Sequence, residues 1–177
     1  MGERMKSNLN ELATTILHLI GQKPMTGYDL TQTEEIGITR PSSHQQIYRE
    51  CRNLVKDGLI EFEIIYQEGK PDKKQYCITG LGQQLLSVLQ SEYTAPKLSK
   101  LRINDAPYAL IGNRVYLQDR INAIKTEIEL LEERLEEDLS PMLILSVQHL
   151  IDLRYAELRF NQGALKLTDT PKLQAIA

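Results

Sequence analysis

The chain has 177 residues, of which 41% are hydrophobic, and a formal charge of −3 at pH 7. This composition excludes a disordered or collagen-like chain. No stretch approaches the roughly 18 consecutive apolar residues of a membrane span, and the start of the chain lacks the apolar core of a signal peptide. We therefore expect a folded cytoplasmic protein with no membrane association.

The sequence contains no motif that is typical of a metal site or of a catalytic nucleophile. Cys51 and Cys77 lack the CxxC spacing of a zinc site, so both are predicted to be small buried hydrophobes. The three histidines fall on separate predicted helices, and the sequence has no HExxH motif, nucleophile elbow or glycine-rich phosphate loop. We predict no catalytic site, no metal and no cofactor.

Two helices are predicted near the start of the chain. Residues 9–20 place apolar side chains at steps of three and four, and Gly21 is a plausible end. After a turn over residues 22–25, a shorter helix opens at Thr26 and fades by residues 35–38. Pro41 then separates it from the next helix.

The third predicted helix covers residues 44–56, with Ser42 or Ser43 as its N-cap. Its inner face is apolar and consists of Ile47, Cys51, Leu54 and Val55. Its outer face is basic and rich in amides and hydroxyls, and consists of Ser42, Gln45, Arg49, Arg52, Asn53 and Lys56.

A hairpin follows this helix. The period changes to two over residues 59–66, a polar loop spans residues 67–74, and a short return strand covers residues 75–78. The loop carries three lysines, which gives the hairpin a basic tip. A further helix with Leu81, Leu85, Leu86 and Leu89 on one side is predicted next.

Irregular sequence over residues 93–106 divides the chain into two predicted domains, 1–92 and 93–177. A near-heptad seam from Leu117 to Leu139 predicts one long helix, and Ser140-Pro141 predicts the start of a second that frays from Gly163 onward. The residues proposed for dimerisation along these seams are Ile121, Ile124, Ile128, Leu131, Leu135, Ile144, Val147, Ile151, Tyr155 and Leu158. A second copy would cover the apolar stripe that one helix pair leaves open; alternatively, the helices fold back on their own N-terminal domain.

The order of three helices and a basic hairpin is that of a winged helix-turn-helix, in which the third helix enters the major groove of DNA. The fold class predicted is mainly α, an α+β winged helix followed by long antiparallel helices that form a dimer interface. Short or amide side chains at the helix start can reach base edges, and Arg or Lys further along can reach guanine edges or phosphates. The side chains that fit are Ser43, His44, Gln45, Arg49 and Arg52; the alternative is an ordinary solvated helix face.

Four segments, TGYDL from Thr26, SHQQIYREC from Ser43, LVKDGLI from Leu54 and QEGKPDKKQYCIT from Gln67, resemble the PadR family of transcriptional regulators, particularly its AphA-like branch. The resemblance covers about residues 10–90. It implies a homodimeric winged-helix regulator whose long helical C-terminal region serves dimerisation in the longer members.

Site residues follow from the resemblance at matching positions only. It places Ser43, His44 and Gln45 at the start of the reading helix, with Tyr48 and Arg49 behind them, the wing tip at Gly69, Lys70, Pro71 and Lys73, and a phosphate contact at Tyr28. Each assignment has an alternative. His44 and Tyr48 lie on the flank of the helix and could pack under the second helix, Tyr28 could be a lid over the core, and Glu68 and Asp72 neutralise part of the charge of the lysines in the loop.

The sequence therefore predicts a regulator that binds a pseudo-palindromic operator in double-stranded DNA as a homodimer. The resemblance allows a small-molecule effector without identifying one, and ten aromatic residues without a Trp do not suggest a stacking pocket. A pI of about 5.7 favours the alternative, a winged-helix adaptor that binds protein instead of DNA.

Overall fold

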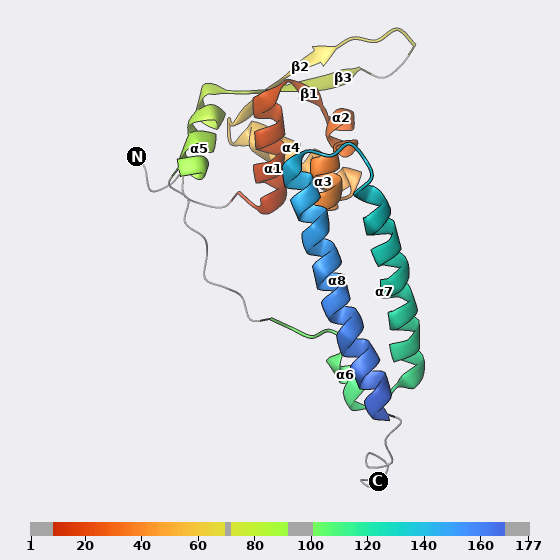
Figure 1. Ribbon diagram of the computed structural model, residues 1–177. Coiled ribbons are helices and arrows are strands. Elements are labelled where there is room, and N and C mark those ends of the chain that lie inside the picture. The colour runs from red at the N-terminus through yellow and green to blue at the C-terminus, as the bar shows by residue number, and fades with distance from the viewer. Residues whose placement is uncertain (1–8, 70–71, 92–100, 169–177) are drawn as a thin grey trace. The chain divides into compact units, whose positions relative to one another are not determined.

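The computed structural model describes residues 9–69, 72–91 and 101–168, and the chain divides into two compact units, Met1–Pro96 and Lys97–Ala177. The predicted domain boundary after Glu92 lies outside the described residues. The described part is mostly helical with one small antiparallel sheet, which confirms the predicted fold class (Figure 1).

The first unit is a winged helix with one more strand and one more helix than predicted. Its elements are α1 Glu11–Gln22, β1 Met25–Thr26, α2 Gly27–Thr31, α3 Glu34–Thr39, α4 His44–Lys56, β2 Ile60–Ile65, β3 Lys73–Ile78 and α5 Gly80–Ser91. The strands form a sheet in the order β1-β3-β2, with both neighbouring pairs antiparallel. The hairpin of β2 and β3 is the wing (Figure 1).

Side chains at the helix starts explain where the helices begin. Asn10 accepts a hydrogen bond from the Ala13 amide at 2.9 Å and caps α1. Reciprocal capping boxes open α2, between Thr26 and Asp29, and α4, between Ser43 and Gln46. Of the two serines proposed as the cap of α4, Ser43 has that role.

The core confirms the predicted inner face of α4. Ile47, Cys51 and Leu54 are at most 1% exposed and join one apolar cluster. The other buried members come from every other element of the unit: Leu12, Ala13, Ile16, Leu17, Leu19, Ile20, Met25, Leu30, Ile36, Leu59, Ile60, Tyr76 and Leu85. Burial raises the pKa of the Cys51 thiol to about 12, so this cysteine is an inert packing residue.

Local sequence signals failed at two places near the start of this unit. The second predicted helix is two helices, because a hydrogen bond from the Thr33 hydroxyl to the Leu30 carbonyl closes α2 before α3 begins. Met25 and Thr26 were expected in a turn and a helix start, yet they pair with Tyr76 and Gln75 as β1. Because the pairing partners lie far away in the sequence, no local periodicity around Met25 predicts this strand.

The wing and α5 differ in detail from the expectation. Strand β3 begins at Lys73 rather than Gln75, because Lys73 and Lys74 pair with Ile65 and Ile64 of β2. Leu81 is exposed, although it was expected on the buried side of α5, because Gly82 and Leu85 are the buried residues of this helix.

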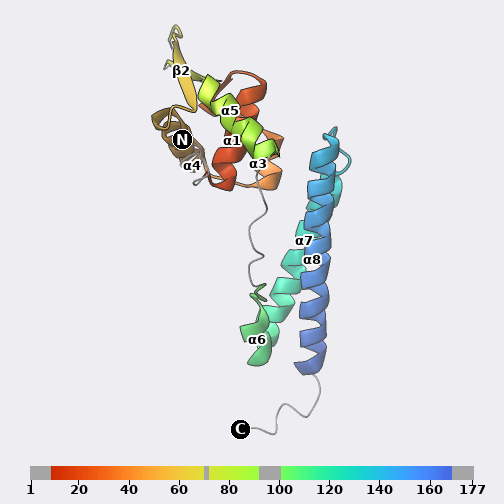
Figure 2. The same ribbon diagram turned by 90° about the vertical axis from the view of Figure 1, so that its left-hand side faces the viewer.

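The second unit consists of α6 Ala106–Leu110, α7 Arg114–Arg134 and α8 Pro141–Thr168. Helices α7 and α8 run antiparallel and side by side (Figures 1 and 2). Ile121, Ile124 and Ile128 of α7 form a buried cluster with Leu158 of α8. No helix in the described part of the chain combines the length and apolar character needed to cross a membrane.

The start of α8 at Pro141 confirms the predicted restart, but other expectations for this unit were wrong. Helix α7 ends at Arg134, so Leu135 and Leu139 lie beyond it. The acidic residues 136–138 follow, and negative charge is unfavourable at the negative end of the helix dipole. Helix α8 continues past Gly163, where fraying was expected, because one interior glycine costs only about 1 kcal/mol and Leu165 packs against the helix-pair cluster. The short helix α6 was not predicted.

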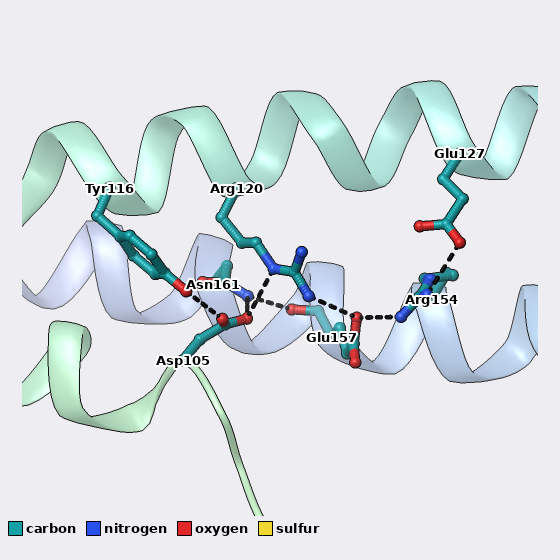
Figure 3. A network of polar contacts seen from close by, with 7 residues as sticks. All are labelled: Asp105, Tyr116, Arg120, Glu127, Arg154, Glu157 and Asn161. Atoms are coloured by element: carbon teal, nitrogen blue, oxygen red, sulfur yellow. Dashed lines mark hydrogen bonds and ion pairs between the residues drawn. The ribbon is translucent and has the colours of Figure 1, made fainter.

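A buried carboxylate, Asp105, ties the start of α6 to both long helices (Figure 3). It accepts hydrogen bonds from the Tyr116 hydroxyl at 2.7 Å, from Asn161 Nδ2 at 2.8 Å and from Arg120 Nε at 3.3 Å. The network continues from Arg120 through Glu157 and Arg154 to Glu127. Burial alone would raise the pKa of Asp105, but the three hydrogen bonds and the charge of Arg120 outweigh it and lower this pKa below 3.8.

Replacing Asp105 with asparagine is expected to destabilise the second unit by about 2 kcal/mol, because hydrogen bonds to a charged group are lost. Since the pKa is lowered on folding, the contribution of the carboxylate is complete above the unfolded pKa and disappears as the pH falls through the folded one. Hydrogen exchange of the α7 and α8 amides should show this loss at pH 7 and a smaller difference below about pH 3.8. The exposed Asp119→Asn is the matched control, and equal protection of wild type and Asp105→Asn at pH 7 would contradict the prediction.

Candidate nucleic-acid interface

The outer face of α4 presents the side chains that were predicted to read DNA. One concave surface is lined by the exposed residues Ser43, His44, Gln45, Gln46, Tyr48, Arg49 and Arg52. The Ser43 hydroxyl already accepts from the Gln46 amide, and the Gln46 side chain accepts from the Ser43 amide at 2.8 Å. Because this cap uses both side chains, His44 and Gln45 are the side chains at the helix start that remain available to a ligand.

Gln45 and Arg49 occupy adjacent turns of this face. Gln45 is exposed, and its amide makes no hydrogen bond within the described residues. The Arg49 side chain is 60% exposed although it pairs with Glu50 at 3.2 Å. A free amide and an exposed guanidinium on one helix face are the groups that make bidentate contacts with adenine and guanine edges.

Tyr48 has a packing role that the sequence left as one of two alternatives. Its ring lies against Gly27 so closely that a Cβ at Gly27 would overlap it. The glycine therefore allows α2 to approach α4, while Tyr48 itself stays 38% exposed at the edge of the helix. Its contact with DNA remains a prediction.

A second concave surface adjoins α4 and carries positive charge. It is lined by Thr26, Gly27, Tyr28, Tyr48, Arg52, Asp72, Lys73, Lys74 and Tyr76. Tyr28 is 57% exposed here, so it is not a lid over the core. Three cations against one carboxylate, together with the two exposed tyrosines, suit the phosphate backbone of DNA.

Lys74 was not among the predicted site residues, although Lys70 and Lys73 of the same expected loop were. In the structure it belongs to β3, and its Nζ lies 4.0 Å from the centroid of the Phe62 ring. This cation–π contact holds the ammonium on the face of the wing that also carries Tyr76. At the wing tip Gly69 has φ of 69°, as a tight turn requires, whereas Lys70 and Pro71 lie outside the described residues.

Glu50 is the other residue that the sequence analysis missed. It is 5% exposed, and its carboxylate accepts hydrogen bonds from Arg49 and from Asn53 Nδ2. Helical periodicity does contain a signal, because Glu50 follows Ile47 by three residues and precedes Leu54 by four, and both are buried. A carboxylate at an inner helix position needs a partner, because burying an unpaired charge is costly.

Most residues proposed for dimerisation are buried or half-buried by contacts within a single chain. Ile121, Ile124, Ile128, Val147, Ile151 and Leu158 are buried, and Leu131 and Leu135 are half-buried. Ile144 and Tyr155 are exposed. One side of α8 also exposes Met142, Leu145 and Leu153, which were not proposed. The described residues contain no group of three or more His, Cys, Asp or Glu side chains placed to hold a metal ion.

Part of the chain is similar in sequence to known transcriptional regulators. The family model "Transcriptional regulator PadR-like family" matches residues 16–88. The "Negative transcriptional regulator PadR" of Bacillus subtilis is 38% identical over 77 residues, which are 42% of this chain and 42% of that protein. The match thus spans less than half of the curated relative.

Solved structures show likeness over more of the chain. Bacillus subtilis PadR in complex with operator DNA has a TM-score of 0.71 at 24% identity, and the match covers 90% of this chain and 100% of that one. The same protein in complex with p-coumaric acid has a TM-score of 0.68 at 22% identity, covering 90% and 99%. The likeness shows that the fold is shared, and the AphA-like branch stays a prediction. Residues 16–88 of this chain, which include α4 and the wing, are thus similar in sequence to PadR-like transcriptional regulators.

Proposed function

We propose that this protein is a transcriptional regulator that binds specific DNA sequences and acts through binding rather than catalysis. The family of residues 16–88 and the operator complex of Bacillus subtilis PadR support this proposal. The observation that carries it is that two concave surfaces adjoin each other at α4. One exposes Gln45 and Arg49, and the other is the groove that contains Arg52, Lys73 and Lys74.

The proposed division of labour follows from the chemistry of the two surfaces. Helix α4 enters the major groove, where His44, Gln45 and Arg49 contact base edges. Arg52, Lys73 and Lys74, with the hydroxyls of Tyr28 and Tyr48, contact phosphates and set the register. Gly69 and Lys70 of the wing tip are proposed to reach the flanking backbone.

We also propose that the protein acts as a homodimer through α7 and α8. The support is apolar surface that a single chain leaves open, namely Met142, Ile144, Leu145, Leu153 and Tyr155 of α8 and Leu130 of α7. The buried members of the predicted seams would then support this surface from beneath. A two-fold dimer presents two α4 helices and so favours a pseudo-palindromic operator.

Selection of bound sequences from a random duplex DNA pool, with the mass of the purified protein in solution measured alongside, tests the proposal. We expect an enriched two-fold motif, a dimer mass, and a loss of affinity of about 10³-fold or more from low to moderate salt. Absence of enrichment at low salt would contradict the proposal and favour the protein-binding adaptor, which the acidic pI of about 5.7 supports.

A small-molecule effector is tested by the same selected DNA. The neighbour solved with p-coumaric acid gives a first compound to add to the binding reaction. Release of the selected DNA would extend the proposal to a phenolic acid as effector, and unchanged binding would exclude that compound.

A further inference from the structure

The Glu50 carboxylate is divided between two partners on its own helix. Its Oε1 accepts from Arg49 Nε at 3.3 Å and from Arg49 Nη2 at 3.2 Å, and its Oε2 accepts from Asn53 Nδ2 at 3.1 Å. One carboxylate oxygen therefore binds Arg49, and the other binds Asn53, one turn further along the helix.

The surroundings of Glu50 fix the carboxylate in place. Its side chain is only 6% exposed, whereas that of Arg49 is 60% exposed. Glu50 and Asn53 line a small pocket of about 250 Å³ together with Leu9, Asn10 and Ala13 at the start of α1. Arg49 belongs instead to the concave surface on the outer face of α4. The buried anion thus borders the pocket beside α1, is held by Asn53 of its own helix, and pairs with a guanidinium on the proposed DNA side.

We infer that Glu50 is a positioning residue for DNA recognition, which orients the Arg49 guanidinium toward base edges. This inference rests on the proposed function. A long arginine side chain that is free on a surface loses rotamer freedom when it binds, and a fixed partner removes part of that cost beforehand.

The same contact lowers the attraction of Arg49 for DNA of any sequence. The carboxylate neutralises the guanidinium locally, which weakens its pull on phosphates. It occupies Nε and one hydrogen of Nη2, and within the described part of the chain Nη1 has no partner. Nη1 and the second hydrogen of Nη2 remain as donors with a fixed direction. Directed donors with reduced net charge favour base reading over phosphate binding.

The variant Glu50→Gln tests the inference, because it keeps the shape of the side chain and removes its charge. The readout is the ratio of the Kd for random duplex DNA to the Kd for the selected operator. We expect this ratio to fall about tenfold, which corresponds to about 1.4 kcal/mol, with binding to random DNA strengthened. Glu63→Gln on the exposed face of β2 removes the same charge without touching Arg49 and should leave the ratio unchanged.

A double-mutant cycle separates positioning from a merely structural role. In an Arg49→Ala background, Glu50→Gln should lower the ratio no further, since its effect passes through Arg49. If Glu50→Gln unfolds the protein, Asn53→Ala replaces it, because loss of the anchor on Oε2 should also lower the ratio.

The outcomes are distinct. The inference would be overturned if wild type binds specifically but the ratio is unchanged in a folded Glu50→Gln protein. The same holds for Asn53→Ala where that variant replaces Glu50→Gln. The proposed function would still stand in either case. The inference would also be overturned if Glu50→Gln lowered the Kd ratio as much in the Arg49→Ala background as it does in wild type. Absence of specific binding by wild type would overturn the proposed function and this inference with it.

Discussion

Replacement of Gln45 by alanine is expected to lower the preference of the protein for its operator over random DNA by about 5- to 150-fold for each half-site. A good bidentate contact to the correct base contributes about 1–3 kcal/mol of discrimination. Gln45 is exposed in the first turn of α4, and within the described residues no protein group competes for its amide. Selection from a random duplex pool with the Gln45→Ala protein should return a motif with relaxed preference at one position in each half-site.

Lys74→Ala is the matched control for Gln45→Ala, because Lys74 lies in the adjoining groove and not on α4. Its loss should weaken binding to all sequences about equally and reduce the slope of log K against log salt by about 1 for each Lys74 removed from the dimer. If Gln45→Ala instead left the selected motif unchanged, the placement of α4 in the major groove would be wrong.

Gly82→Ala is expected to destabilise the first unit by about 3 kcal/mol, the upper range for overpacking. A Cβ at this position would overlap the carbonyl oxygen of Leu59. That oxygen cannot move freely, because it accepts from the Thr79 amide at 3.1 Å, and the Thr79 hydroxyl donates to the neighbouring Gly58 carbonyl at 2.7 Å. The Thr79 hydroxyl in turn accepts from the Gly82 amide at 3.1 Å. Chemical denaturation of the purified variant measures the loss.

Gly80→Ala provides the comparison within the same helix. A Cβ at Gly80 would meet nothing within 4 Å, so we expect a change of less than about 1 kcal/mol. Alanine normally stabilises a helix relative to glycine, so opposite signs for the two substitutions would show that close approach to Leu59 is what requires Gly82. Equal effects would contradict this explanation.

Much of the fold could be predicted because short-range patterns carry it. The inner face of α4, the wing and the restart at Pro141 each follow from periodicity or capping within about a dozen residues. The positions of Gln45 and Arg49 on the outer face of α4 follow from the same periodicity. Failures occurred where a partner is distant, as in the pairing of Met25 with Tyr76.

The sequence by itself determined the winged-helix order, the similarity of residues 16–88 to PadR-like regulators and the polar outer face of α4, because helical periodicity and motif spacing are local properties. Only the tertiary structure decided that Glu50 is buried and bound to Arg49, that Tyr48 packs on Gly27, and that Lys74 joins Arg52 in one groove. It also decided that Ile121, Ile124 and Ile128 pack within the chain. Each of these depends on which elements pack against each other, and packing determines which polar groups lose water and must find a partner.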